Sequence, residues 1–411
     1  MEPNLNTSST ALVKVESIDG HCRLTVNDEP FFVKGAGGGF GQTETLALRG
    51  GNSIRTWSTK NAARILDDAH AVGLKVLMGL DVARERHGFD YDSRTAVKQQ
   101  LDTLAAQVRD FKDHPALLAW GIGNELNLEA TNPAVWDAVN EIATMIHELD
   151  GNHPATTMLA GANKNVVDEY NARCAEVDFL SIQMYGDVGH AKEKITAAGY
   201  AGPYLITEWG ATGHWEVPLT PWNAPIEQTS SEKADAILER YNAAILGDPE
   251  NCMGSYVFLW GQKQERTPTW YGLFTEAGEQ TEAIDVMQYV WTGSWPEHRA
   301  PRLTDITVDG KTRYDGVKLA ADASARATVT AASRTSSPLS IRAEILSEAT
   351  VVGQGGDFEP RPDAFPDSIE NLTDDSIEFT APVKPGPYRL FAYVTDGSGR
   401  VATANLPFFV E

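Results

Sequence analysis

Two glutamates in this chain directly follow apolar segments. Burying a carboxylate there costs free energy unless the group is hydrogen-bonded or takes part in a reaction. Glu125 ends the stretch "LLAWGIGNE", and Glu208 lies in "PYLITEWG", so each follows an apolar run typical of a buried strand. Two carboxyl groups that face each other across a sugar ring are what retaining glycoside hydrolysis requires, since one is the nucleophile and the other is first acid and then base. The pair therefore indicates chemistry at an anomeric carbon.

Strands and helices alternate through most of the chain, and this alternation must position the two glutamates. Counting from "FFVKGAGG", the sequence predicts eight short apolar strands, most of them separated by amphipathic helices. Apolar runs without polar alternation are typical of parallel strands covered on both faces. Eight such units predict an α/β fold, the (β/α)8 TIM barrel. A doubly wound open sheet is the alternative, but "GAGGGFG" lacks the GxGxxG spacing of a dinucleotide site. We interpret those glycines as a closely packed strand end.

The sequence pattern changes near residue 300. Short alternating strands with Gly, Pro, Asp and Ser turns follow "WTGSWPEHRAPRL", as in a small β-sandwich. We therefore expect a flexible N-terminus at 1–11, a catalytic (β/α)8 barrel with an N-terminal β-hairpin at 12–300, and an all-β, immunoglobulin-like sandwich at 301–411. The sandwich shows no outstanding aromatic constellation, so packing against the barrel is favoured over independent polysaccharide binding.

Residues at the carboxyl ends of the strands are the candidate substrate contacts, because that edge of a (β/α)8 barrel holds the active site. Aromatic faces bind the apolar faces of sugars, so tryptophans at this edge are predicted subsite platforms, whereas Trp120, inside a strand, is assigned to the core. Asp81, His87 and His214 are polar candidates for which simple solvent exposure is an equal alternative. The predicted substrate-binding set is Arg55, Asp81, Asn124, Gln183, Tyr185, Trp209, Trp215 and Trp260.

Two motifs resemble those of a known group of enzymes. "WGIGNELN" resembles the fourth-strand motif of clan A retaining glycoside hydrolases, and "LITEWG" resembles their seventh-strand motif. The resemblance implies that Glu125 is the acid/base, that Glu208 is the nucleophile and that Asn124 binds the substrate's 2-hydroxyl. It also implies that Arg55 and Tyr185 support the nucleophile and that the Trp260 ring forms the bottom of the sugar subsite at the cleaved bond.

The resemblance covers residues 12–300 and is stronger for the clan than for one family. Leu126 stands where the cellulase-like family has proline, and Gln183 stands where that family has histidine and family 2 barrels have asparagine. "VNDEPFFVKG" and "ITEWGA" look more like family 2 barrels, although the leading sandwich domains of that family are absent. A bare barrel followed by an immunoglobulin-like module resembles bacterial laminarinase-like endo-β-1,3-glucanases. The implied substrate is a β-linked glucan, with β-1,3-glucan favoured.

Composition and motifs exclude several classes of function and partner. A formal net charge of -23 argues against a nucleic-acid partner, because nucleic-acid binding needs a basic protein surface. No apolar run reaches the roughly 18 residues of a membrane span, and no HxH or HExxH pattern indicates a metal. We expect no cofactor, no metal, a saccharide partner and a monomer. The start "MEPNLNTSST" is not a signal peptide, so the compartment stays open, with secretion or a bacterial periplasm favoured. Alternatives are a transglycosylase using the same two glutamates, an inactive carbohydrate-binding barrel, and a scaffold in which the sandwich is the working part.

Overall fold

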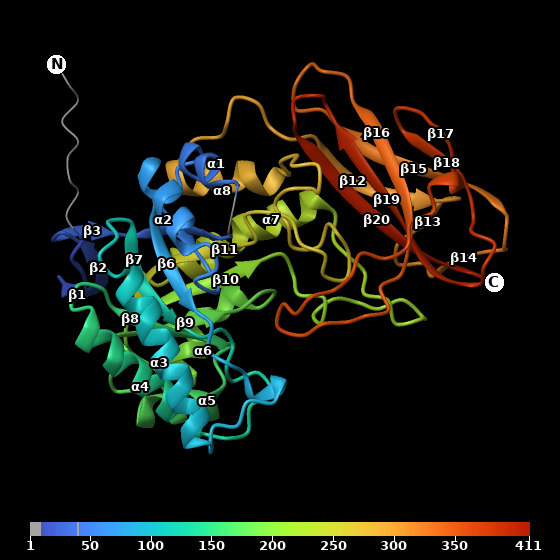
Figure 1. The fold of residues 1–411 in the computed structure, drawn as a ribbon. Coiled ribbons are helices and arrows are strands. Elements are labelled where there is room, and N and C mark those ends of the chain that lie inside the picture. Colours follow the sequence, from blue (N-terminus) through green and yellow to red (C-terminus); the bar gives the residue numbers. More distant parts are fainter. Residues whose placement is uncertain (1–9, 39–40) are drawn as a thin grey trace. The chain divides into compact units, whose positions relative to one another are not determined.

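A closed barrel of eight strands dominates the computed structural model, which describes residues 10–38 and 41–411 (Figure 1). Its strands follow the order β10-β11-β4-β5-β6-β7-β8-β9, and their pairing is parallel. The predicted (β/α)8 barrel is confirmed. The strands are β4 (Val33–Gly37), β5 (Ser53–Arg55), β6 (Lys75–Leu80), β7 (Leu117–Ile122), β8 (Ala155–Ala160), β9 (Phe179–Gln183), β10 (Tyr204–Gly210) and β11 (Cys252–Phe258).

Helices follow the barrel strands along the chain. The amphipathic pattern of the sequence shows in them, since α4 buries residues such as Val135, Val139 and Ile142 on one side and keeps charged residues on the other. Short helical turns occur at η1 (Glu85–His87), η2 (Val188–His190) and η3 (Tyr241–Ile245). The α-helices are α1 (Thr43–Leu48), α2 (Ala62–Ala71), α3 (Arg94–Phe111), α4 (Ala134–Leu149), α5 (Lys164–Arg173), α6 (Ala191–Ala197), α7 (Ser230–Arg240) and α8 (Glu282–Thr292).

A three-stranded antiparallel sheet precedes the barrel and packs on its interior. The sheet consists of β1 (Val13–Ile18), β2 (His21–Val26) and β3 (Glu29–Phe31). Val13 and Leu24 belong to one apolar cluster with residues from the first half of several barrel strands, among them Leu118, Phe179 and Leu205. Each such fully buried side chain contributes about 1.5–3 kcal/mol to folding. The apolar layer therefore fills the amino ends of the strands, and the polar residues gather at the carboxyl ends.

The chain divides into two compact units. One holds the chain up to Trp209 together with Tyr241–Val257, and the other holds Gly210–Arg240 and Phe258–Glu411. Helices α7 and α8 thus group with the C-terminal strands. The domain boundary near residue 300 stays a prediction from the sequence pattern.

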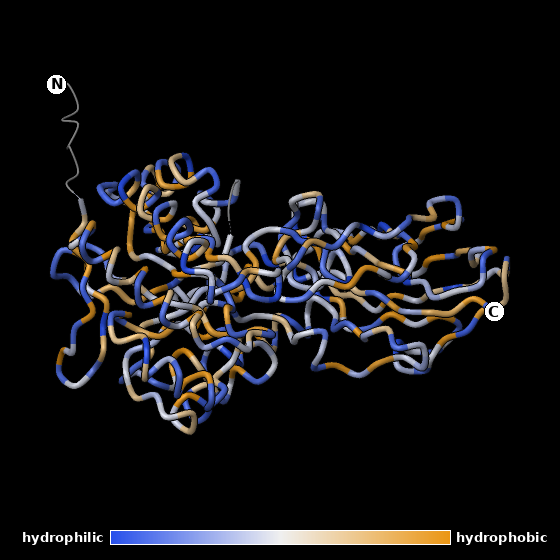
Figure 2. The backbone as a smooth tube through the Cα atoms, turned by 60° about the horizontal axis from the view of Figure 1, so that its bottom comes forward, coloured by the Kyte–Doolittle hydropathy of each residue, from blue (hydrophilic) through white to orange (hydrophobic). Residues whose placement is uncertain are grey.

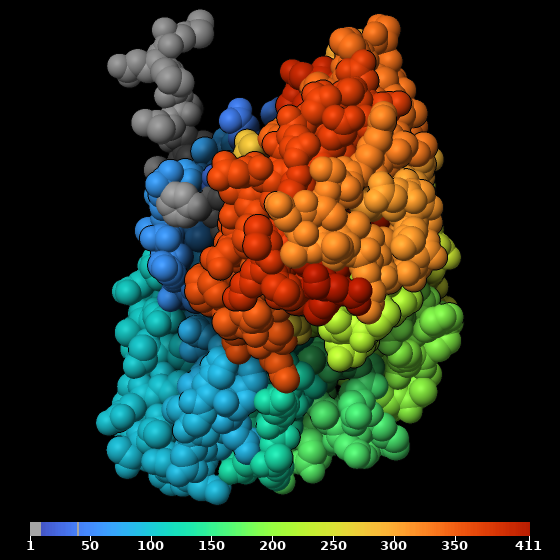
Figure 3. All heavy atoms as spheres, turned by 90° about the vertical axis from the view of Figure 1, so that its right-hand side faces the viewer, coloured from blue at the N-terminus to red at the C-terminus, as the bar shows by residue number. Residues whose placement is uncertain are grey.

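The second unit contains the predicted β-sandwich, which is confirmed. One sheet has the order β13-β12-β15-β18-β17, and the other has the order β14-β20-β19-β16. In Figure 2 apolar segments run along these strands and many turns between them are hydrophilic. Figure 3 shows one face of the unit, where the red C-terminal segment lies beside the orange segment that precedes it. The strands are β12 (Arg302–Val308), β13 (Lys311–Thr312), β14 (Val317–Leu319), β15 (Ser324–Ala332), β16 (Ser340–Ser347), β17 (Ile369–Leu372), β18 (Ser376–Thr380), β19 (Gly386–Thr395) and β20 (Val401–Val410), with the turn η4 (Pro366–Ser368) before β17.

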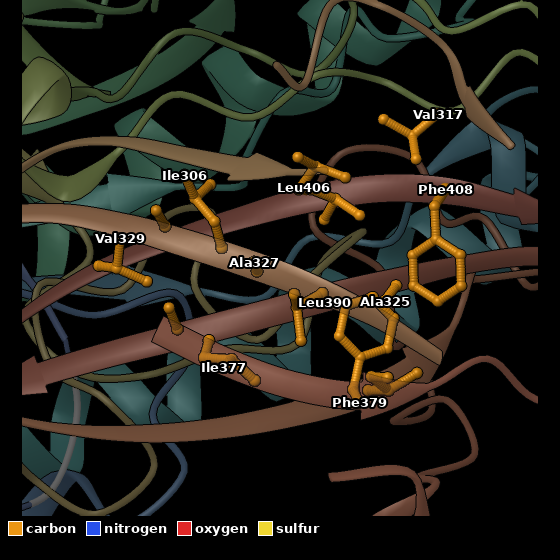
Figure 4. Packing of buried hydrophobic residues seen from close by; sticks show 14 of the residues in the cluster. Ile306, Val317, Ala325, Ala327, Val329, Ile377, Phe379, Leu390, Leu406 and Phe408 are labelled. Atoms are coloured by element: carbon orange, nitrogen blue, oxygen red, sulfur yellow. The ribbon is translucent and has the colours of Figure 1, made fainter. Parts of the chain in front are cut away.

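The sandwich core lies between its two sheets (Figure 4). Ile306 and Phe379 come from one sheet, Leu390 and Phe408 come from the other, and all four side chains are fully buried. Along β15 buried and exposed residues alternate, as expected for a strand with one face on a core. The composition change seen in the sequence thus reflects a change from strands buried on both faces to strands buried on one.

Buried carboxylates in the second unit have structural partners. Lys233 Nζ donates to Glu227 Oε1 at 2.5 Å, and Asn405 Nδ2 of β20 donates to Glu227 Oε2 at 2.5 Å. Burial works to raise the pKa of Glu227, but the charge and hydrogen bond of Lys233 outweigh it and hold this pKa below its usual value. Because its partners satisfy it, Glu227 ties α7 to the sandwich and is not a candidate for catalysis.

Candidate active site

Glu208 lies at the carboxyl end of β10 among four hydrogen-bond donors. Its Oε1 accepts from Arg55 Nη1 at 2.7 Å, from Trp57 Nε1 at 2.7 Å and from Gln183 Nε2 at 3.0 Å. Its Oε2 accepts from the Tyr185 hydroxyl at 3.0 Å. The Glu208 side chain is 8% exposed and that of Arg55 is 1% exposed. Donors aimed at a carboxylate favour its ionised form, so this arrangement suits a group that must carry negative charge.

A β-bulge aims Glu208 into this set of donors. Ile206 pairs with Ile182 of β9, and Glu208 pairs with the next residue, Gln183, so Thr207 is the extra residue. The Arg55 Nη1 that reaches Glu208 also donates to the carbonyl oxygen of Thr207 at 3.1 Å. Bulges next to active sites re-aim a side chain, and here the guanidinium fixes both the bulge and the carboxylate.

Asn124 shares two of these donors and is oriented by them. Its Oδ1 accepts from Arg55 Nη2 and from Gln183 Nε2, the latter at 2.7 Å. Both neighbours are donors, so the amide must present oxygen to them and turn its Nδ2 elsewhere. In the described part of the chain Nδ2 makes no hydrogen bond with protein, and the buried Oε1 of Gln183 also has no partner there. One donor and one acceptor are thus left for a polar ligand.

Glu125 is held in an unusual backbone conformation just after β7. Its φ is +51°, in the left-handed region that non-glycine residues rarely occupy, and Gly123 before it has φ +70°. The backbone N of Glu125 donates to the carbonyl oxygen of Met158 in β8 at 3.0 Å. The buried Leu126 packs over Gly123, because a Cβ at Gly123 would lie 2.7 Å from Leu126 Cδ1. Such conformations cost about 1–3 kcal/mol and cluster at functional sites.

The structure brings together most of the polar residues predicted from the sequence. Arg55, Asn124, Gln183 and Tyr185 meet around Glu208, and their roles in binding and catalysis stay predictions. Trp57, one of the tryptophans expected at this edge of the barrel, joins them as a hydrogen-bond donor to Glu208, a role that the sequence does not predict. Its position two residues after Arg55 at the same strand end was the available signal, since residues i and i+2 of an extended segment share a face.

Two of the predicted sugar platforms lie in the core instead. Trp209 is fully buried, and its ring lies 5.9 Å from that of Tyr241. It follows Glu208 directly in β10, and adjacent strand residues point to opposite faces, so it faces away from the donors of Glu208. Trp260 is 3% exposed and packs on Phe274 and Trp291 at 5.6 and 5.7 Å between ring centroids. Neither indole offers an open face to a sugar.

Trp215 and Asp81 keep exposed surfaces, and their roles stay predictions. Trp215, in the second unit, is 61% exposed and contacts His214 edge-on at 4.9 Å. Burial, together with the charges of Arg266 and Lys263, lowers the pKa of His214 to about 4. Asp81 lies 3.6 Å from Arg84, whose Nε donates to the carbonyl oxygen of Asn124 at 3.3 Å. Of the other polar candidates, His87 ends the turn η1.

Within residues 10–38 and 41–411 no three His, Cys, Asp or Glu side chains form a group that could hold a metal ion. No helix in the same ranges is long and apolar enough to cross a membrane.

The sequence of the barrel also matches a known family model. Residues 53–217 match the model described as glycosyl hydrolases family 2, TIM barrel domain. The barrel is thus similar to the TIM barrel domain of family 2 glycosyl hydrolases. The matched residues include Arg55, Asn124, Gln183, Tyr185 and Glu208. No curated protein matches the chain.

Solved structures share the fold at low sequence identity. A β-D-glucuronidase from Dictyoglomus thermophilum has a TM-score of 0.54 and 17% identity, over 70% of this chain and 54% of that one. A β-glucuronidase from Faecalibacterium prausnitzii has a TM-score of 0.54 and 18% identity, over 68% and 52%. β-Glucuronidase 2 of Bacteroides uniformis, a calcium-binding mutant, has a TM-score of 0.53 and 12% identity, over 98% and 48%. The chain thus spans about half the length of these structures.

Proposed function

We propose that this glycoside hydrolase barrel cleaves β-linked glucans with retention, with Glu208 as the nucleophile and Glu125 as the acid/base. The observation that supports the proposal best is the set of four donors on Glu208, one of them a buried guanidinium. A nucleophilic carboxylate must stay ionised and oriented, and this set serves both needs. Glu125 is half-buried at the end of β7, three strands from β10 around the barrel.

The reaction proceeds in two displacements. Glu208 attacks the anomeric carbon while Glu125 protonates the departing glycosidic oxygen, and the glycosyl-enzyme is then hydrolysed by a water that Glu125 deprotonates. Nδ2 of Asn124 donates to the substrate's 2-hydroxyl, a bond that strengthens in the transition state. Retention requires a carboxyl separation of about 5.5 Å between Glu125 and Glu208. If a sugar hydroxyl replaces water in the second step, the same site is a transglycosylase.

A neutral substrate suits the charges around Glu208. The guanidinium of Arg55 already pairs with Glu208 and Asn124, so it has little charge left for an anionic sugar. A net charge of -23 also repels an anionic polymer. The β-1,3 linkage is proposed on the resemblance of a barrel followed by an immunoglobulin-like module to laminarinase-like enzymes.

β-Glucuronide hydrolysis is the second candidate. The structural neighbours are β-glucuronidases, and a uronate carboxylate needs a cation beside the site. Arg84 supplies one, since its Nε donates to the backbone oxygen of Asn124 and its charge is only weakly paired with Asp81.

A substrate panel tests both candidates. It contains β-1,3-, β-1,4- and mixed-linkage glucans and an aryl β-glucuronide, with product sizes and the anomeric configuration of the first product recorded. We expect a β-anomeric product from β-1,3-glucan. Hydrolysis of the glucuronide alone would favour the second candidate, and longer oligosaccharides at high substrate concentration would indicate transglycosylation.

Variants of the two glutamates test the catalytic assignment. Glu208→Ala and Glu125→Ala are each expected to lose about 10⁴-fold or more in kcat. Azide should rescue Glu125→Ala on substrates with a good leaving group, because such substrates need no acid and azide replaces the activated water. Glu141→Ala on α4, an exposed glutamate 3.9 Å from Arg94, is the matched control and should keep full activity. Full activity in either catalytic variant would remove the assignment.

A further inference from the structure

We propose that Trp57 is a positioning residue whose indole N–H fixes Oε1 of Glu208 and so leaves Oε2 as the oxygen that attacks the anomeric carbon. The inference rests on the proposed function, in which Glu208 is the nucleophile.

The two carboxylate oxygens of Glu208 accept different numbers of hydrogen bonds. Oε1 accepts three N–H donors, from Arg55, Trp57 and Gln183, at 2.7, 2.7 and 3.0 Å. Three donors occupy the lone-pair directions of a carboxylate oxygen. Oε2 accepts a single hydrogen bond in the described part of the chain, from Tyr185 at 3.0 Å. The free lone pair therefore lies on Oε2.

That asymmetry assigns the atoms of the first displacement. An electron pair of Oε2 forms the bond to the anomeric carbon, and the pair of the breaking glycosidic bond goes to the leaving oxygen, which takes the proton of Glu125. The negative charge that remains on the carboxylate before attack is held at Oε1 by the three N–H donors. Donors that are already in place need no reorganisation when the substrate reacts.

The barrel has a slot for the Trp57 side chain. A Cβ on Gly37, in the neighbouring strand β4, would lie 3.0 Å from Cη2 of the indole. A Cβ on Gly79, in β6 on the other side, would lie 2.5 Å from the carbonyl oxygen of Thr56 and 2.7 Å from Trp57 Cα. The two glycines thus let the backbone and the ring of Trp57 approach their neighbours closely.

Arg55 stabilises the same ring orientation. Its guanidinium carbon lies 5.1 Å from the centroid of the Trp57 ring, within the range of a cation–π contact. Trp57 and Arg55 therefore hold each other while both donate to Oε1. An indole that served packing alone would not need its N–H at 2.7 Å from a carboxylate.

Trp57→Phe separates the donor from the packing, because it keeps an aromatic ring and removes the N–H. We expect kcat to fall about 10- to 100-fold, the usual effect of losing one hydrogen bond to a charged group, with KM little changed.

Covalent labelling separates this inference from the proposed function. A 2-deoxy-2-fluoro glycoside with a good leaving group should label Glu208 in the wild type, detected by peptide mass spectrometry, and should label Trp57→Phe about 10- to 100-fold more slowly. No label on wild-type Glu208 would remove the proposed function itself. A label at wild-type rate in Trp57→Phe would overturn the role of Trp57 alone.

Two further variants keep the test decisive. Trp136→Phe on α4 makes the same substitution at a residue that is 4% exposed, and it should leave kcat and the labelling rate unchanged. Gly37→Ala keeps Trp57 but crowds its Cη2, so it should lower kcat and the labelling rate by a smaller factor. If Trp57→Phe does not fold, Gly37→Ala decides, and a wild-type kcat and labelling rate in that variant would refute the inference.

Discussion

Removing the guanidinium of Arg55 should lower both the free energy of unfolding and the activity, because both depend on its contact with the Glu208 carboxylate. Nη1 lies 2.7 Å from Glu208 Oε1 and 3.1 Å from the oxygen of Thr207, and Nη2 reaches Asn124. In Arg55→Met the buried carboxylate loses the cation that contacts it and keeps three neutral donors. The variant thus leaves a charge in the barrel that is hydrogen-bonded but no longer paired.

The size of the effect follows from the burial of the pair. Removing one partner of a buried ion pair costs about 3–5 kcal/mol, and the three remaining donors place the expected loss of unfolding free energy near 3 kcal/mol. The same loss of support in the transition state corresponds to about a 10²-fold fall in kcat/KM. Arg94→Met is the matched control, because that side chain is 92% exposed and 3.9 Å from its partner, and should change stability by well under 1 kcal/mol.

A double-mutant cycle measures the coupling directly. Urea unfolding of the wild type, Arg55→Met, Glu208→Gln and the double variant should show that Arg55→Met costs about 1.5 kcal/mol less when Glu208 is already neutral. Equal costs in the two backgrounds would refute the idea that charge pairing with Glu208 is what Arg55 provides.

Two further predictions concern stability against pH, each measured as the melting temperature at constant ionic strength. Burial works to raise the pKa of Asp150, but the hydrogen bond and charge of His153 outweigh it and hold this pKa below its usual value. Its stabilisation is therefore present above about pH 4 and lost on further acidification, and Asp150→Asn should flatten that loss; an unchanged acid slope would contradict the pairing. Burial lowers the pKa of His214 to about 4, so the unfolded chain takes up a proton first and stability falls as pH drops from about 6.5 to 4. His214→Gln should remove this fall, and the same slope in both proteins would contradict it.

The sequence predicts which residues meet because the fold rule is simple. Parallel strands bring their carboxyl ends to one edge, so residues far apart in the chain, such as Arg55, Gln183 and Glu208, could be expected together once eight strands were counted. The rule does not say toward which face of the sheet the side chain of a residue at that edge points. Trp209 shows this, since it shares a strand end with Glu208 but points the other way and packs on Tyr241.

The hydrogen-bond pattern around Glu208 could not be predicted from the sequence. It depends on the bulge at Thr207, which shifts the register of β10 by one residue, and on the space left by Gly37 and Gly79 beside Trp57. Both are consequences of tertiary packing, and neither leaves a periodic pattern in the chain. The left-handed backbone of Glu125 is of the same kind, because a short sequence such as "GNE" does not specify which of its residues takes the strained conformation.

At the carboxyl ends of the barrel strands, some polar atoms are already hydrogen-bonded by the protein and others are not. This difference connects the fold to the chemistry. Oε1 of Glu208 and Oδ1 of Asn124 are fully engaged by donors from the barrel, which fixes both side chains without a ligand. In the described part of the chain the lone pair of Oε2, the Nδ2 of Asn124 and the Oε1 of Gln183 have no such partners. Because an unsatisfied buried polar group costs about 1–3 kcal/mol, a sugar hydroxyl that donated to the buried Oε1 of Gln183 would be bound favourably. The same bonds that make the barrel rigid would then direct binding toward the atoms that react.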